Sequence, residues 1–481
     1  MSTRTARILT CLPFTCTLLA PAIAAAESEP TSPAAAAETT PVAAPTATAA
    51  APSASTPAAP ASAAPAAEKA SEPFAFGDFT WVNGTARQSK PLLDSPLFTG
   101  SFLLDLNYTY SFARPIDNTV VGSTALSRNN EFTVQFMGFG GDFHYEHVRG
   151  RLMTQFGMRS EVVPRNDGST NRGQFDLADS LRYVSEAYGG YHWDKMHGIN
   201  LDVGIFMSYV GLFSYDNFDN WAYQPSFTSD NTPWFFNGAR LQMFPSDKFK
   251  LELWLINGWQ TYGKFNEMPG LGTQLLWRPE EWISMMTNDY VGTDTQDAPG
   301  RVRFHSDNSA VVRYFNAPGS FFDRAAFSIT ADFGVEKGAG VSPFGGNGTT
   351  AQNFISAMAY HRMWFDHNHY GWTVGGGFMH NPGRYLVLAP TGVANTTFGP
   401  VPNPGTDFDA WDLSTTVDYM PDDYQTWRLE LVHREASVPY FAGHGGVTSP
   451  DGYVTTPVPT GWTPDLRKSE TRLIGAFLLR L

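Results

Sequence analysis

Cysteine, charged residues and long apolar runs are all scarce in this chain, and each scarcity excludes a class of structure or site. The two cysteines, Cys11 and Cys16, lie in a segment that we expect to be cleaved off, which would leave the mature chain without a disulfide or a thiolate metal site. No stretch approaches the roughly 18 consecutive apolar residues of a membrane-spanning helix. Charged residues make up 16% and aromatic residues 14% of the chain, whereas charge in soluble domains is nearer a quarter. That pairing is typical of a membrane β-barrel, in which apolar residues occupy every second position and aromatic residues mark both interfaces.

The first 73 residues predict two segments that precede the folded domain. Residues 1–26 have the pattern of a secretory signal, with a basic start, an apolar stretch and small residues before Glu27. Residues 27–73 are almost entirely Ala, Pro, Thr and Ser without an aromatic residue, so we expect a disordered linker. It is either a periplasmic spacer or an inert connection. Residues 74–481 then form the barrel domain.

The net charge is negative. It is −14 for the whole chain and −16 after removal of residues 1–26, because that segment contains two arginines and no acid. Nucleic acid is therefore excluded as an expected partner, since binding it needs clustered Lys and Arg. The acidity is compatible with a pore that mildly favours cations.

The C-terminal stretch 470–481 predicts a strand that ends with the polypeptide. Its one face carries Leu473, Gly475, Phe477, Leu479 and Leu481, and the other carries Arg472, Ile474, Ala476, Leu478 and Arg480. An exposed edge of this kind risks aggregation in a soluble fold, and closing a barrel removes it. The apolar face would then meet lipid while the arginines meet a wet lumen.

Alternation with period two recurs along the rest of the domain and predicts about sixteen strands. The expected strands lie near 101–112, 131–140, 148–159, 181–192, 199–210, 234–244, 249–258, 271–278, 282–291, 307–316, 325–336, 352–364, 371–380, 410–420, 426–436 and 470–481. A soluble sandwich would also alternate, but the connections here are short and long in turn, as in a bacterial barrel with tight periplasmic turns. An even strand number places both termini on the periplasmic side. Phe79–Gly84 is either an additional strand or, as we favour, a segment in the periplasmic mouth.

A succession of motifs resembles a known family. Tyr183-Val-Ser-Glu-Ala-Tyr-Gly-Gly190 is followed by Asp202-Val-Gly-Ile-Phe-Met-Ser-Tyr-Val-Gly211, then by Asn237-Gly-Ala-Arg-Leu241 and Ile256-Asn-Gly-Trp259. The series resembles the OmpL-like putative β-barrel porins of the outer-membrane porin superfamily. The resemblance implies an outer-membrane channel but supplies no substrate residues. The terminal Leu481 departs from the Phe with which outer-membrane proteins usually end.

The loop 211–233 is the candidate constriction, because a barrel of this size needs something to narrow its lumen. General porins, by analogy, fold the loop at this position inward; alternatively it packs outward against a neighbouring subunit or stays above the barrel. The candidate constriction residues are Asp216, Asp219, Asp230, Trp221 and Tyr223. The candidate lumen-facing charges on neighbouring strands are Arg149, Arg151, Arg240, Lys250 and Glu252. Opposed charges across a constriction would filter solutes by size and charge.

These features favour a passive porin for small hydrophilic solutes in the outer membrane of a Gram-negative cell. We expect no catalytic residues, cofactor or metal, because the histidines with ligand-like spacing, in 144–147 and 366–369, lie in predicted short turns and no Ser–His–Asp motif context occurs. The expected partners are outer-membrane lipid, the barrel assembly machinery, small solutes and, by analogy, two further copies in a homotrimer. The N-terminal linker and the C-terminus would be periplasmic. A barrel hydrolase and a surface-exposed structural or adhesive barrel remain alternatives.

Overall fold

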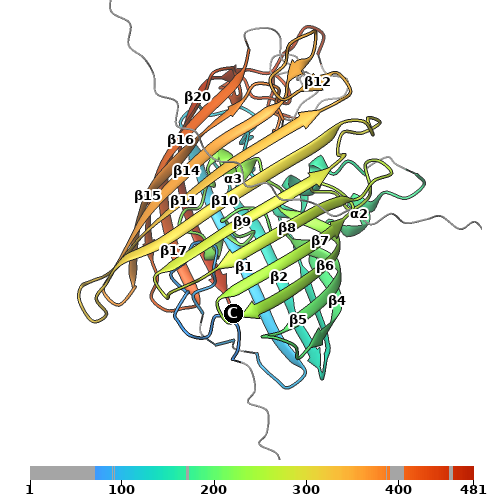
Figure 1. The fold of residues 1–481 in the computed structure, drawn as a ribbon. Helices are drawn as coiled ribbons and strands as arrows, with labels where there is room; N and C mark the ends of the chain where they lie inside the picture. The colour runs from blue at the N-terminus through green and yellow to red at the C-terminus, as the bar shows by residue number, and fades with distance from the viewer. Residues whose placement is uncertain are drawn as a thin grey trace, which may run out of the picture. The chain divides into compact units, whose positions relative to one another are not determined.

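The computed structural model describes residues 71–88, 90–91, 93–169, 173–385, 387–390, 406–453 and 459–481. The predicted signal and nearly all of the predicted linker lie outside these residues. The described chain forms a closed antiparallel barrel of sixteen strands (Figure 1). The predicted fold class is therefore confirmed.

Each barrel strand pairs with its neighbours in chain order. The barrel strands are β1 (Phe98–Ser111), β2 (Phe132–Tyr145), β3 (Val148–Thr154), β4 (Val184–Trp193), β5 (Ile199–Met207), β6 (Phe235–Ser246), β7 (Phe249–Ile256), β8 (Gly270–Trp277), β9 (Ile283–Gly292), β10 (Val302–Asn316), β11 (Phe322–Lys337), β14 (Asn353–Phe365), β15 (Tyr370–Asn381), β16 (Phe408–Tyr419), β17 (Gln425–Ala436) and β20 (Ser469–Arg480). The connections add two small strand pairs and five short helices: β12 (Val341–Ser342) with β13 (Thr350–Ala351), β18 (Phe441–Ala442) with β19 (Leu466–Arg467), α1 (Arg159–Val162), η1 (Pro164–Asn166), α2 (Leu177–Leu181), η2 (Asn217–Asp219) and α3 (Phe227–Asp230). Within the described ranges, no helix is long and apolar enough to cross a membrane.

The last strand closes the barrel against the first. Leu104 of β1 pairs with Leu479 of β20, and Tyr108 pairs with Gly475. The other edge of β20 pairs with β17 along its whole length. The edge predicted to need a partner is thus covered on both sides, and no strand of the described barrel is left with a free edge.

The two faces of the strands differ as the alternation predicts. In β20, Ile474 and Leu478 are fully buried inside the barrel, and Arg472 is buried beside them. In β16, Asp412 and Asp418 face inward, whereas Leu413 is 55% exposed on the outer face. The outer wall is therefore apolar and suited to lipid, while the inner wall carries the charged and polar side chains.

The connections alternate between short and long at the two ends of the barrel. The short ones are 146–147, 194–198, 247–248, 278–282, 317–321, 366–369 and 420–424. The long ones are 112–131, 155–183, 208–234, 257–269, 293–301, 338–352, 382–407 and 437–468. Because the strand number is even, β1 begins and β20 ends at the end with the short turns. Figure 1 shows the C-terminus there and β12 at the opposite end.

The segment before β1 enters the barrel at the short-turn end. Phe79, Trp81 and Val82 are at most 6% exposed and pack in one cluster with residues of the 208–234 loop. Gly84 has a positive φ of 76°, and a Cβ there would lie 2.2 Å from the carbonyl oxygen of Leu212. A larger residue at this position would push the segment away from the loop. Of the two alternatives for this stretch, the segment in the mouth is the one observed.

Candidate functional site

The 208–234 loop, which joins β5 to β6, lies inside the barrel. Tyr223 and Phe227 are fully buried, and Trp221 is 4% exposed. Figure 1 shows α3 of this loop within the ring of strands. Of the expected positions for the loop, the inward one is observed.

Carboxylates on the wall bind the backbone of this loop. Glu430 of β17 accepts hydrogen bonds from the backbone N–H groups of Tyr223 and Gln224, at 2.6 and 2.9 Å. Asp412 of β16 accepts from the backbone N–H of Phe227 and the hydroxyl of Ser226, at 2.9 and 2.8 Å. Buried N–H groups that have lost water need such acceptors. These two acids therefore fix the middle of the loop against one side of the wall.

Arginines of the same wall bind the loop's carbonyl groups. Arg428 makes a two-pronged ion pair with Asp418, at 2.7 and 3.0 Å, and donates to the carbonyl oxygen of Asn220 at 2.7 Å. Arg362 of β14 also donates to Asp418, at 2.7 Å, and to the carbonyl oxygen of Trp221 at 3.2 Å. The loop is thus bound to β14, β16 and β17.

A glycine makes room for this packing. A Cβ at Gly377 of β15 would lie 2.6 Å from the hydroxyl oxygen of Ser226 in the loop. Glycine inside a strand often marks such a close approach by another segment. The glycine run Gly375–Gly377 therefore lies where the loop contacts the wall.

The acids expected to form the constriction are in ion pairs with the wall. Arg480 of β20 donates to Asp219 at 2.7 and 2.9 Å and lies 3.8 Å from Asp216. Asp230 pairs with Arg434 of β17 at 2.9 Å and accepts from the hydroxyl of Thr124 at 2.8 Å. Burial raises the pKa of the Asp216 carboxyl, which lies outside the strands, to about 6.

The two aromatic constriction candidates are also enclosed. The backbone N–H of Trp221 donates to the side-chain oxygen of Asn83, at 2.7 Å, in the segment before β1. The hydroxyl of Tyr223 donates to Asp105 of β1 at 2.7 Å. Trp221 therefore connects the loop to the segment before β1, and Tyr223 connects it to β1 itself.

The expected lumen-facing charges pair with other wall residues. Arg149 and Arg240 both approach Asp202 of β5, at 3.3 and 2.7 Å. Arg151 pairs with Asp142 and Glu186, at 2.6 and 2.5 Å. The ammonium of Lys250 lies 2.9 Å from Glu252. The expected pairing of these cations with the loop acids is absent from the described residues, where Arg480 and Arg434 take that place.

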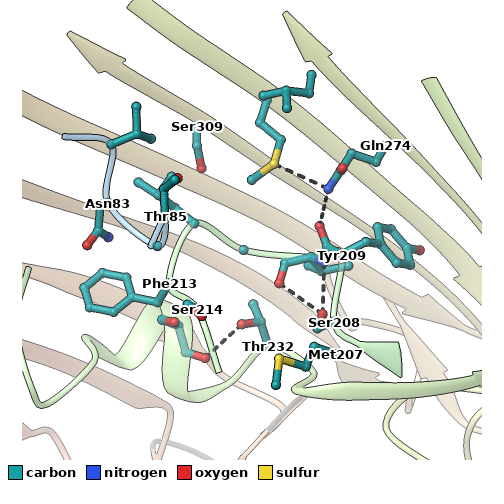
Figure 2. A pocket seen from close by; sticks show the side chains of 18 of the residues that line it. Asn83, Thr85, Met207, Ser208, Tyr209, Phe213, Ser214, Thr232, Gln274 and Ser309 are labelled. Atoms are coloured by element: carbon teal, nitrogen blue, oxygen red, sulfur yellow. Dashed lines mark hydrogen bonds between the residues drawn. The ribbon is translucent and has the colours of Figure 1, made fainter. Parts of the chain in front are cut away.

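A cavity of about 250 Å³ lies on the other side of the loop. Figure 2 shows Thr232 of the loop on one side of this cavity and Ser309 of β10 on the other, and Gln274 of β8 donates a hydrogen bond to the carbonyl oxygen of Tyr209 at 2.7 Å. Its lining comes from three parts of the chain: the segment Val82–Thr85; Met207 at the end of β5 with the loop residues Ser208–Tyr215, Ser229 and Thr232–Trp234; and the strand-side residues Lys250, Gln274, Leu276, Arg278, Ser284, Met286, Ser309 and Val311. The cavity therefore runs between the loop and the inner face of β7–β10.

A second cavity of about 270 Å³ lies toward the long-loop end. Trp259, Asp294, Arg303 and Tyr385 are among its lining residues. Thr232 lines both cavities, so the end of the 208–234 loop lies between them. The two cavities are therefore neighbours on one side of the barrel.

Several residues that bind the loop or line the cavity are not among the site residues predicted from the sequence. Glu430, Asp412 and Arg428 bind the loop, and Arg278 and Ser309 line the cavity. The alternation in β16 and β17 placed the first three on the inner face, which was the available signal. Of the ten predicted residues, Lys250 lines the first cavity and Asp230 the second. Over the described ranges, no three His, Cys, Asp or Glu side chains gather as metal ligands do.

Comparison with known proteins gives one family match. The model of the family "Putative beta-barrel porin-2, OmpL-like" matches residues 98–456. No curated protein matches the chain in sequence. Among solved structures, the chain is similar to the outer membrane channel DcaP of Acinetobacter baumannii, with 11% identity, a TM-score of 0.47, and 79% of this chain and 97% of that chain covered. It is also similar to OmpT of Vibrio cholerae, with 8% identity, a TM-score of 0.46, and 82% and 100% covered.

Proposed function

Because the chain belongs to the OmpL-like putative β-barrel porin family, we propose that this outer-membrane porin passes small hydrophilic solutes between its 208–234 loop and strands β7–β10. The uneven attachment of the loop carries this proposal. Ion pairs and hydrogen bonds bind the loop to β14, β16, β17 and β20. On the other side Tyr209, near the start of the loop, bonds to Gln274 and to the carbonyl oxygen of Asp289, and a cavity lies between later parts of the loop and β7–β10. A wide barrel needs such a narrowing if it is to select by size.

The predicted constriction residues then have different roles. Asp216, Asp219 and Asp230, with Trp221 and Tyr223, hold the loop in place. Lys250 belongs to the surface that a solute meets. Arg149, Arg151, Arg240 and Glu252 form paired charges that stiffen the wall beside that surface. The proposal is supported by the ion pairs of these residues and by the burial of the loop acids.

We also propose an orientation and a passive mechanism. The short turns and both ends of the barrel domain would face the periplasm, as is usual for bacterial barrels, with the linker on the same side. A channel of this kind needs no catalytic residue or cofactor. The proposed path along the loop favours the passive channel over the hydrolase and the adhesive barrel, because neither of those requires a narrowed aqueous route.

A polar patch on the outer wall supports a homo-oligomer, for which we propose the trimer. Asn288 and Asp307 are buried inward, so alternation places neighbouring side chains on the lipid face. These outward polar residues are Thr273, Thr287, Asp289, Ser306 and Asn308. A carboxylate within the apolar band is costly when lipid covers it, and a second copy would remove that cost. Native mass spectrometry should show trimers for the wild type and dissociation for Asp289→Ala with Asn308→Ala; monomers from the wild type would contradict this assembly.

Single-channel recording in planar bilayers tests the channel itself. Folded protein, identified by its heat-dependent mobility on gels, should give stable steps of current proportional to voltage. Silence from folded protein would contradict the pore and favour the structural or enzymatic alternatives.

A further inference from the structure

The cavity beside β7–β10 carries charge of one sign. The charged residues in its lining are Lys250 and Arg278. The remaining lining is neutral, with hydroxyl, amide, aromatic and methionine side chains. The chain as a whole has a net charge of −14. The charge at the passage is therefore opposite to the charge of the protein.

The nearby acids do not contribute to this lining. Asp216, Asp219 and Asp230 are directed toward arginines on the far side of the loop. On the near wall, Asp307 and Asp332 are 1% and 3% exposed. Asp307 accepts a hydrogen bond from Asn288 at 2.9 Å, and Asp332 lies 3.4 Å from His305. These carboxylates are enclosed within the wall.

The two cations differ in how far their charge is compensated. Lys250 lies 2.9 Å from Glu252, which is 2% exposed. The Arg278 guanidinium donates through Nε to Ser284 at 3.2 Å and lies over the rings of Phe79 and Phe74, at 4.4 and 5.0 Å. It forms no ion pair with any residue of the described ranges. Within the described ranges, its two Nη groups donate no hydrogen bond, and Arg278 is one of the residues that line the cavity.

The second cavity has no such excess of positive charge. Its charged lining consists of Asp230 and Asp294 with Arg303 and Arg384, and Arg303 lies 3.5 Å from Asp294. The acids and arginines balance there. The unbalanced charge is confined to the short-turn side of the loop, where Arg278 and Lys250 lie.

We propose that this passage prefers anions to cations and that Arg278, with Lys250, forms the site that selects them. This rests on the proposed passage along β7–β10. An uncompensated cation at a narrow mouth with low-dielectric walls raises the local concentration of anions. Paired guanidinium donors also match the oxygens of carboxylate and phosphate groups. The solute class is therefore small organic and inorganic anions, in contrast to what the net charge of the chain suggests.

Reversal potentials across a potassium chloride gradient test the preference. The wild type should show a chloride permeability above that of potassium. Arg278→Gln with Lys250→Gln should lower the ratio of chloride to potassium permeability by about threefold or more, because the local field is removed. Arg278→Lys should keep most of the preference, and the single variant Lys250→Gln provides a second measure if the double variant does not fold.

Lys248→Gln is the matched control. Lys248 is a cation in a turn at the same end of the barrel; it lies 3.8 Å from Glu280 and does not line the cavity. Its removal should leave the reversal potential unchanged. A wild type that conducts but prefers potassium would overturn the anion site alone, as would an unchanged ratio in the double variant. Folded protein without conductance would overturn the passage and the anion site together.

Discussion

Arg480 of the closing strand donates through Nη1 to both carboxylate oxygens of Asp219 in the 208–234 loop, at 2.9 and 2.7 Å. The strand that completes the barrel is thereby joined to the loop that narrows it. Arg480 and Asp219 are 18% and 7% exposed in their side chains. Closure of the barrel and placement of the loop should therefore depend on each other.

Removing one partner of this pair should destabilise the protein. In Asp219→Asn the guanidinium of Arg480 keeps a weak acceptor, and in Arg480→Gln the carboxylate of Asp219 is left buried without its cation. We expect a loss of about 2–3 kcal/mol in the unfolding free energy for Arg480→Gln, and less for Asp219→Asn. Urea unfolding in detergent micelles measures both. Arg467→Gln, which breaks an exposed pair with Asp465, should cost less than about 1 kcal/mol; equal losses in all three variants would contradict the coupling.

Glu430→Ala should free the middle of the loop. The backbone N–H groups of Tyr223 and Gln224 would lose their acceptor, which favours conformations in which water reaches them. We expect new cleavage by proteinase K within residues 217–227, detected by mass spectrometry, and a noisier current. Glu435→Ala is the control, since Glu435 is an exposed residue of the same strand. An uncut loop in Glu430→Ala would show that this carboxylate does not hold it.

Asp216 predicts a specific dependence of stability on pH. Burial raises the pKa of its carboxyl from 3.8 to about 6, so the folded protein favours the protonated form. The stabilisation of the folded protein by the protonated Asp216 carboxyl is fully present below pH 3.8 and is lost as the pH rises through about 6. Asp216→Asn keeps a neutral side chain at every pH, so its stability relative to the wild type should rise between pH 4 and 7 by up to about 3 kcal/mol. Urea unfolding at each pH measures this difference, with Asp423→Asn as the control for an exposed carboxylate; a difference that is flat with pH would contradict the assignment.

The barrel could be predicted because its signal is local. Period-two alternation assigns each side chain to a face without knowledge of its neighbours, and short and long connections then give the order of the strands. Strand ends were less accurate. β3 was expected to reach 159 but ends at Thr154, because the chain leaves the wall there and the Gln155 side chain bonds to the Arg182 carbonyl and the Tyr215 hydroxyl.

The site was only partly predictable for a different reason. Alternation placed Arg428 and Glu430 on the inner face, but their partners are backbone groups of a loop more than 200 positions away in the sequence. Which acids are consumed in ion pairs and which line a cavity depends on how that loop lies against the wall. The sequence pattern therefore predicted an inward loop rich in acids and a lumen-facing Lys250. It predicted neither Arg278 at the cavity nor a cavity on the side of the loop away from its acids.

Substituted cysteines can locate the passage relative to the loop, because the domain from residue 74 onward contains no cysteine. Ser309 of β10 lines the cavity beside the loop, whereas Ser414 of β16 is on the wall to which the loop is bound. Each is changed to cysteine, and the channel current is recorded before and after a charged methanethiosulfonate reagent is added. The reagent should block most of the current in Ser309→Cys and none in Ser414→Cys. Block in Ser414→Cys with no effect in Ser309→Cys would show that solutes do not pass beside β7–β10.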